Sequence, residues 1–194
     1  MNKRSRPILY INCGPSGSGK TYFGRRFARE HGLAYLSSDR LRQEIYGGQV
    51  GDIPEAHKHI FKIMWYLAEE LLGNGVSVVF DSMSHLEEYR KTLRDIARKA
   101  GARAVVLYFK TPLDTALTRV TKRHRFKAKH LEPYFHKTPE HIVRQFYREF
   151  EEPRAYETSA TITSDMSYKE GVETIAILLK KRGIKTARFV CPLP

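Results

Sequence analysis

Short apolar runs alternate along the chain with segments whose apolar positions recur at helical spacing. Uninterrupted runs of this length are typical of strands buried on both faces, and the spaced pattern is typical of amphipathic helices. The pattern predicts strands near residues 8–11, 33–36, 76–80, 104–109 and 158–163. It predicts helices over residues 21–28, 40–46, 56–72, 85–100, 112–122, 139–150 and 168–181. We therefore expect a three-layer α/β/α fold with about five parallel strands, formed by one domain over residues 1–194.

A glycine-rich stretch connects the first predicted strand to the first predicted helix. It reads Gly14, Pro15, Ser16, Gly17, Ser18, Gly19, Lys20 and Thr21, which fits the phosphate-binding pattern G-x-x-x-x-G-K-[ST]. The backbone N–H groups of such a loop wrap around phosphate, Lys20 reaches the β and γ oxygens, and the Thr21 hydroxyl ligates Mg²⁺. The alternative is an ordinary glycine-rich turn, but the strand before it and the helix after it favour a P-loop NTPase that binds ATP and Mg²⁺.

Two acidic residues follow predicted strands, at the sheet edge where parallel sheets bind ligands. Asp39 follows the second strand, and Arg42, three residues later, shares its helix face. A carboxylate there can take a proton from an acceptor hydroxyl, and Arg42 can hold a neighbouring anion. The alternative is that Asp39 caps its helix and pairs with Arg42. Asp81 follows the third strand and is expected to reach Mg²⁺ through water, with helix capping as its alternative.

A basic segment follows the fourth strand. Arg119 and Arg123 are four residues apart on the predicted helix, so they project from one face and can contact the triphosphate. Seven lysines and arginines lie between Arg119 and Lys137, against the single acidic residue Glu132. We expect a basic helical lid over about residues 119–150. The alternative for any one of these arginines is a solvated surface charge.

The formal net charge of +13 points to a phosphate-rich second substrate. A basic surface that serves solubility or the triphosphate alone is the alternative. The two cysteines, Cys13 and Cys191, have no metal-site spacing and are expected to be reduced. No apolar segment reaches the length of a membrane span, so the expectation is a cytoplasmic protein with no membrane partner. The oligomeric state is left open.

These motifs together resemble the P-loop kinase superfamily that contains bacteriophage polynucleotide 5′-hydroxyl kinase, bacterial end-healing kinases, zeta-toxin-like kinases and several small-molecule kinases. The resemblance covers about residues 7–165. It rests on the phosphate loop, Ser38-Asp39-Arg40-Leu41-Arg42, Phe80-Asp81-Ser82, Arg119 with Arg123, and Phe150-Glu151-Glu152-Pro153.

The resemblance implies a role for each matching residue. It implies that Asp39 is the general base, that Arg42 contacts a substrate phosphate and that Arg123 contacts the ATP phosphates. Many relatives carry Asp-x-Thr-Asn after the third strand, whereas this chain has Ser84 at the last of these positions. Any contact made by that asparagine is therefore in doubt.

The motif set predicts an ATP-dependent kinase that transfers the γ-phosphoryl group to a hydroxyl. The leading acceptor is the 5′-hydroxyl of a DNA or RNA end, which the basic surface favours. A small-molecule kinase acting on a nucleoside, sugar or antibiotic is the first alternative. A nucleic-acid-binding ATPase is the second.

Overall fold

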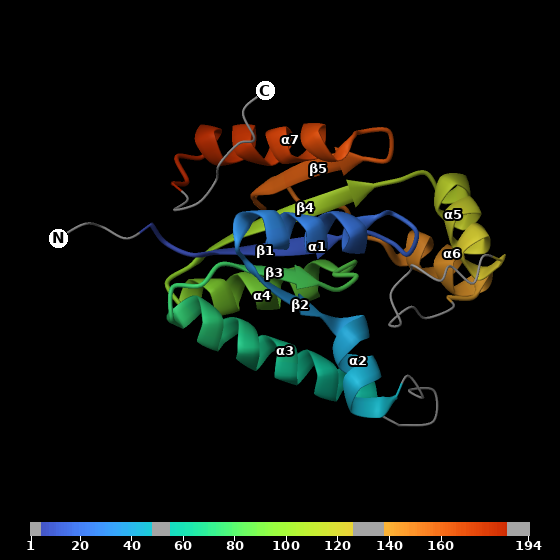
Figure 1. Ribbon diagram of the computed structural model, residues 1–194, viewed down its shortest axis with the longest axis horizontal. Helices are drawn as coiled ribbons and strands as arrows, with labels where there is room; N and C mark the ends of the chain where they lie inside the picture. Colours follow the sequence, from blue (N-terminus) through green and yellow to red (C-terminus); the bar gives the residue numbers. More distant parts are fainter. Residues whose placement is uncertain (1–4, 48–54, 126–137, 186–194) are drawn as a thin grey trace.

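The computed structural model describes residues 5–47, 55–125 and 138–185 (Figure 1). Its strands are β1 (Ile8–Cys13), β2 (Ala34–Ser37), β3 (Val78–Asp81), β4 (Arg103–Lys110) and β5 (Ser159–Thr163). Its helices are α1 (Lys20–His31), α2 (Ser38–Tyr46), α3 (Ala56–Gly73), α4 (Glu87–Lys99), α5 (Leu113–Arg125), α6 (Glu140–Glu149) and α7 (Tyr168–Lys181).

The five strands form one parallel sheet in the order β2-β3-β1-β4-β5. The strands at its centre are fully buried, which explains why their sequences are apolar without alternation. Because the strands are parallel, their carboxyl ends share one edge, and the segments that follow each strand meet there.

Two apolar cores cover the two faces of the sheet, so the protein has the three layers that the sequence predicts. One core joins the sheet to α1 and α7 through side chains such as Phe27 and Ile175, both fully buried. The other joins it to α3 and α4 through Met64 and Leu93. Figure 1 shows α5 and α6 together beyond the arrowheads of the strands, at the edge where the carboxyl ends lie. No helix in the described part of the chain is long and apolar enough to cross a membrane.

Element ends differ from the sequence prediction where local hydrogen bonds intervene. The third strand begins at Val78 rather than Val76, because the Val76 N–H completes the end of α3 by donating to the Leu71 carbonyl, after Gly75 with a φ of 81°. Helix α2 begins two residues earlier than predicted, since Ser37 caps it. The predicted loop over residues 47–54 and the basic stretch through Lys137 fall largely outside the described residues.

Candidate nucleotide and acceptor site

Three adjacent strand ends form a row that places the predicted site residues together. Asp81 at the end of β3 pairs in register with Ser37 of β2 on one side and with Asn12 of β1 on the other. Helix α2 starts directly after Ser37, and the glycine-rich loop starts two residues after Asn12. The segments that carry Asp39 and Lys20 therefore leave the sheet from the same edge, with Asp81 between them.

The glycine-rich loop has the backbone geometry that a phosphate cradle needs. Gly17 has a φ of 85°, and a Cβ there would lie 2.6 Å from the Ala116 carbonyl oxygen, so only glycine fits. Gly19 occupies the N-cap of α1 in the left-handed conformation and provides no side-chain cap. The first N–H groups of α1 thus have no capping side chain, and helix N-termini of this kind bind phosphate.

Side chains in this loop also fit a phosphate ligand. The Ser18 Oγ is buried and has no hydrogen-bond partner among the described residues. Within the described residues, the Lys20 ammonium makes one long hydrogen bond, 3.4 Å, to the Pro15 carbonyl. Thr21 is exposed in the first turn of α1. A triphosphate would offer acceptors to the first two groups, and the Thr21 hydroxyl is accessible to a metal ion bound with it.

Asp81 is held by a buried network that sequence reasoning did not find. Its two carboxylate oxygens accept from Asn12 Nδ2 at 2.9 Å and from the Tyr35 hydroxyl at 2.6 Å. Asn12 Nδ2 also donates to the Lys20 carbonyl at 3.1 Å, which connects Asp81 to the first turn of α1. Burial and, secondarily, the Asp81 charge raise the pKa of Tyr35, so its hydroxyl remains a donor. The only sequence signal was a polar residue, Asn12, inside an apolar strand.

Asp39 and Arg42 form an ion pair on the first turns of α2. Arg42 Nη1 donates to Asp39 Oδ1 at 2.7 Å. The Asp39 side chain is 54% exposed and that of Arg42 only 12%. The capping alternative for Asp39 is wrong, because the Ser37 hydroxyl accepts from the Arg40 N–H and caps the helix. Asp39 is thereby left accessible, with a guanidinium fixing one of its oxygens.

Arg119 lies against the phosphate loop, as the predicted contact with a triphosphate requires. Its guanidinium donates to the Gly17 carbonyl at 3.5 Å and to the Ser164 carbonyl at 3.1 Å. The segment just before helix α6 reaches the loop too, since the hydroxyls of Ser16 and Thr138 are 3.3 Å apart. Arg123 lies in α5, but its side chain is outside the described residues.

The loop that follows β3 forms a floor under the glycine-rich loop. The Met83 carbonyl accepts from the Gly14 N–H at 3.2 Å, and the Ser84 carbonyl accepts from the Cys13 thiol at 3.3 Å. Ser84 itself is buried, has a φ of 44°, and its hydroxyl bonds that of Ser82 at 2.8 Å. Ser84 therefore serves the floor of the loop through its backbone. Burial raises the pKa of the Cys13 thiol to about 12, so it stays protonated.

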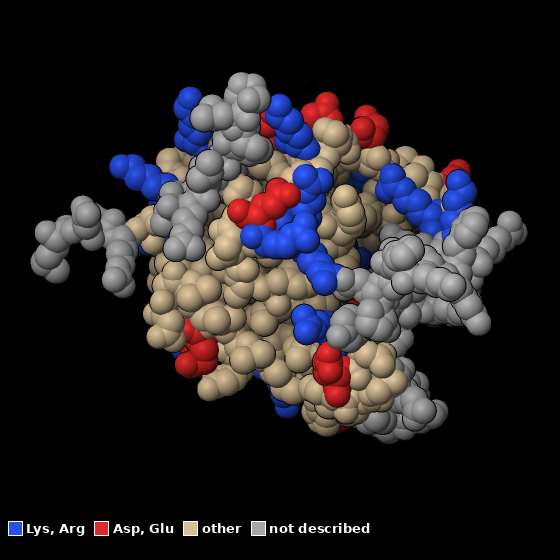
Figure 2. All heavy atoms as spheres, in the orientation of Figure 1, with Lys and Arg blue, Asp and Glu red and all other residues tan. Residues whose placement is uncertain are grey.

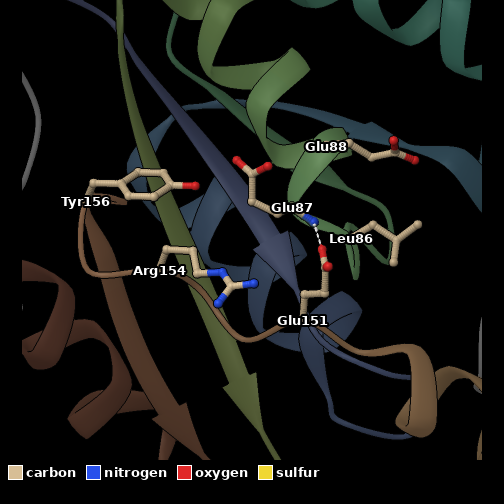
Figure 3. A pocket seen from close by; sticks show the side chains of 6 residues that line it. All are labelled: Leu86, Glu87, Glu88, Glu151, Arg154 and Tyr156. Carbon is tan, nitrogen blue, oxygen red and sulfur yellow. Dashed lines mark hydrogen bonds between the residues drawn. The ribbon is translucent and has the colours of Figure 1, made fainter.

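A pocket of about 440 Å³ lies between the start of α4 and the segment that follows α6 (Figure 3). Its lining includes Glu87, Glu151, Arg154 and Tyr156, and no residue of the glycine-rich loop. Glu151 caps α4 there, accepting from the Glu87 N–H at 2.5 Å. The pocket is thus separate from the candidate nucleotide site.

The parallel sheet, the phosphate loop and the uncapped α1 define a P-loop NTPase scaffold. The chain belongs to the AAA_33 family, described as an AAA domain, whose model matches residues 9–153. It is 23% identical over 147 residues to the L-seryl-tRNA(Sec) kinase of Methanococcus maripaludis. That match covers 75% of this chain and 53% of the relative, so the chain spans about half the length of the relative that it matches.

Solved structures share this fold over nearly the whole chain. Kti12 of Chaetomium thermophilum, in complex with ADP-AlF3, superposes with a TM-score of 0.69 at 19% identity, covering 92% of this chain and 100% of that one. The APS kinase CysC of Mycobacterium tuberculosis, in complex with AMPPNP and APS, gives 0.62 at 22% identity, covering 91% and 99%. At these identities the likeness establishes the fold alone.

Proposed function

We propose that this protein is an ATP-dependent phosphotransferase that moves the γ-phosphoryl group to a hydroxyl. One observation carries the proposal. Adjacent strand ends set an uncapped phosphate loop and a solvent-accessible carboxylate, Asp39, at the same edge of the sheet. A nucleotide hydrolase needs a positioned water, whereas a carboxylate accessible beside an arginine suits an acceptor that brings its own hydroxyl and its own charge.

The loop residues fit MgATP. The N–H groups of residues 14–21 and the Lys20 ammonium would hold the β- and γ-phosphates, with Ser18 donating its hydroxyl. Thr21 would ligate Mg²⁺, and Asp81 would reach the ion through water, one lone pair of each of its oxygens remaining after the bonds from Asn12 and Tyr35. The Mg²⁺ ion, when bound, neutralises charge on the phosphates.

We further propose that residues 119–150 act as a lid within a single domain, with Arg119 and Arg123 directed at the triphosphate.

The transfer step requires a base for the acceptor. The acceptor oxygen forms a bond to the γ-phosphorus while the bond from that phosphorus to the bridging oxygen breaks, and ADP leaves. Asp39 takes the acceptor proton on its carboxylate. Arg42 fixes Asp39 in place through its Nη1, and its Nη2 lies 3.3 Å from His57 Nδ1. We assign the guanidinium to contact with an acceptor phosphate.

We propose the 5′-hydroxyl of a nucleic acid as the acceptor. Figure 2 shows basic side chains gathered over α1, with others toward α2. On α1 the exposed residues Tyr22, Arg25 and Arg29 occur at positions i, i+3 and i+7, so they share one helix face that begins beside the phosphate loop. An exposed tyrosine with arginines suits stacking of a base and contact with phosphates. The relative's name also places its acceptor on a tRNA.

A small-molecule acceptor is the competing proposal. The structural likeness to an APS kinase, solved in complex with AMPPNP and APS, favours it. Arg42 suits a small-molecule acceptor as well as a nucleic acid if that molecule carries an anion close to its hydroxyl.

The deciding experiment offers purified protein a panel of acceptors with γ-labelled ATP and Mg²⁺. The panel holds 5′-hydroxyl DNA and RNA oligonucleotides, matched 5′-phosphorylated oligonucleotides, nucleosides, sugars and aminoglycosides. We expect label on the 5′-hydroxyl oligonucleotides and none on the 5′-phosphorylated controls. Label on a small molecule alone would overturn the nucleic-acid acceptor. Phosphate release stimulated by nucleic acid, with no labelled acceptor, would replace the kinase by an ATPase.

A further inference from the structure

An arginine at the sheet-facing side of α4 forms the most completely buried polar cluster of the described chain. Arg90 and Glu157 pair at 3.0 Å, and both side chains are 0% exposed. Every N–H of the guanidinium has an acceptor. Nε and one N–H of Nη2 reach the Glu157 carboxylate, and the other Nη2 N–H reaches the Glu152 carbonyl at 3.4 Å. Nη1 donates to the carbonyls of Ser84 at 3.1 Å and His85 at 3.2 Å.

These acceptors belong to two segments that are distant in sequence. Ser84 and His85 form part of the loop after β3, and Glu152 and Glu157 belong to the connection between α6 and β5. Arg90 Nη1 also lies 3.9 Å from the thiol of Cys13, the residue before the phosphate loop. One guanidinium therefore contacts three segments that are far apart in the sequence: the end of β1, the loop after β3, and the connection between α6 and β5.

The loop after β3, which Arg90 holds, also contacts the start of the phosphate loop. Its Met83 carbonyl receives the Gly14 N–H and its Ser84 carbonyl receives the Cys13 thiol, so the first residues of the cradle rest on it. The Ser84 carbonyl that supports Cys13 is the same one that Arg90 fixes. A shift of this carbonyl would therefore displace Cys13 and the first residues of the phosphate loop.

The same guanidinium reaches the segment that returns from α6. The Glu151 N–H donates to the His85 carbonyl at 3.0 Å, beside the bond from Arg90 to that carbonyl. Glu152 is held by Arg90 through its backbone and by the Tyr108 hydroxyl, at 2.8 Å, through its carboxylate. Tyr108 stands opposite Cys13 in the sheet register.

We propose that Arg90 is a positioning residue that fixes the floor of the nucleotide cradle and ties it to the segment after α6. The inference rests on the proposed function, since it assigns the cradle to a nucleotide. Buried ion pairs commonly contribute no more stability than apolar residues of similar volume, so conformational specificity is the role we assign to this one. Lysine cannot replace Arg90, because an ammonium has three donors and lacks the planar fork.

Arg94 offers a matched control on the same helix. It binds the same Glu157, and it also binds Glu87 at 2.5 Å and lies over the Tyr156 ring at 5.5 Å. Glu87 and Tyr156 line the pocket in Figure 3. Among the described residues, Arg94 makes no hydrogen bond to Met83 or Ser84. A general loss of stability would follow from changing either arginine, whereas disorder of the cradle floor would follow from changing Arg90 alone.

The test compares Arg90→Lys with Arg94→Lys at a temperature where both are folded by circular dichroism. Amide hydrogen exchange is measured without nucleotide, and the dissociation constants of MgATP and ADP are measured by calorimetry. We expect exchange in residues 12–20 and 82–86 to be at least tenfold faster in Arg90→Lys, with nucleotide binding at least fivefold weaker. Arg94→Lys should stay within twofold of the wild type in both measurements.

A double variant tests the role of Arg90 if Arg90→Lys does not fold. Arg90→Met with Glu157→Leu removes both buried charges together, which preserves folding better than removing one. It should fold, yet exchange quickly at residues 82–86. Wild-type exchange at residues 12–20 and 82–86 in the folded Arg90 variants, or equal effects of Arg94→Lys, would overturn the role. A wild type that binds no nucleotide and labels no acceptor would refute the proposed function, while the exchange data would still decide the role of Arg90.

Discussion

Two arginine–carboxylate pairs in this molecule have opposite environments. Arg42 and Asp39 share one hydrogen bond on α2, and more than half of the Asp39 side chain faces solvent. Arg90 and Glu157 are both fully buried, and the guanidinium uses all of its donors. A pair whose carboxylate faces solvent can open at little cost and exchange its partner for a substrate. A fully buried pair cannot lose one partner without leaving a charge in the interior. The Arg42–Asp39 pair is therefore suited to a role in the reaction, and the Arg90–Glu157 pair is suited to holding the fold in place.

The largest effect should follow from changing the exposed pair, and it should be kinetic. In Asp39→Asn, the carboxylate that takes the acceptor proton is gone, so we expect kcat to fall about 10²- to 10⁴-fold. The dissociation constant of MgATP should stay within about twofold. Transfer is measured with γ-labelled ATP and the acceptor found in the panel. Full transfer by Asp39→Asn would remove Asp39 from the mechanism.

The buried pair should show the larger effect on stability. We expect Arg90→Met to lower the free energy of unfolding by about 3–5 kcal/mol, because the buried Glu157 keeps Arg94 but loses its fully buried partner, and the carbonyls of Ser84 and His85 lose a donor. Arg42→Met is the matched change at the exposed pair and should cost less than about 1 kcal/mol, since Asp39 remains in solvent. Urea unfolding followed by circular dichroism measures both. Equal losses would erase the distinction between the two pairs.

A third site lies between these extremes, at the buried end of β3. Tyr35→Phe removes the 2.6 Å hydrogen bond to Asp81, and we expect it to lower the free energy of unfolding by about 1.5–3 kcal/mol. The Mg²⁺ concentration for half-maximal ATP binding should also rise. Tyr168→Phe is the control, because it removes a 2.8 Å bond to the exposed Glu30 on the α1 and α7 side. If both variants keep the wild-type Mg²⁺ dependence, Tyr35 does not orient Asp81 toward the ion.

The smallest effect concerns pH and His85, whose carbonyl belongs to the buried cluster. Burial lowers the pKa of His85, although Glu149, Glu151 and Glu88 oppose this shift and Arg90 adds to it. The unfolded chain therefore binds a proton more readily than the folded one. This contribution to stability is complete above the ordinary histidine pKa of about 6.5 and is lost as the pH falls below it.

Unfolding midpoints measured from pH 7.5 to 5 check this dependence. The slope should be shallower in His85→Gln, which cannot take up the proton. His141→Gln provides the control, since His141 is exposed on α6. An identical slope in His85→Gln and the wild type would assign the pH dependence to other groups.

The sequence predicted the elements and the cradle because their signals are local. Residues 14–21 match a spacing that phosphate geometry imposes, and the closing helix runs from Tyr168 to Lys181 as the pattern indicates. The ion pair of Asp39 with Arg42 was foreseen as a possibility from the spacing of three residues. The N-cap of α2 could not be assigned from the sequence, because Ser37, Ser38 and Asp39 are all good capping residues. The extended backbone of Ser37 makes it the N-cap in the structure.

Contacts between distant segments could not be read in this way. Tyr35 and Asp81 are 46 residues apart, and Arg90 and Glu157 are 67 apart. Arg90 did leave a trace, since it lies three residues before Leu93 and seven before Ala97 on the buried face of α4. A charged residue at an apolar position indicates burial with a partner, but nothing in its own helix names that partner.

The sequence by itself therefore determined a parallel α/β fold with a phosphate loop, and candidate residues at its carboxyl edge. Periodicity, glycine spacing and residue chemistry act over a few positions, so they can be read along the chain. Only the tertiary structure decided that Asp39 is exposed, that Tyr35 and Asn12 hold Asp81, and that Arg90 supports the cradle. These depend on strand order and on which side chains the closed core leaves in contact, because burial and hydrogen-bond partners are set when remote segments come together.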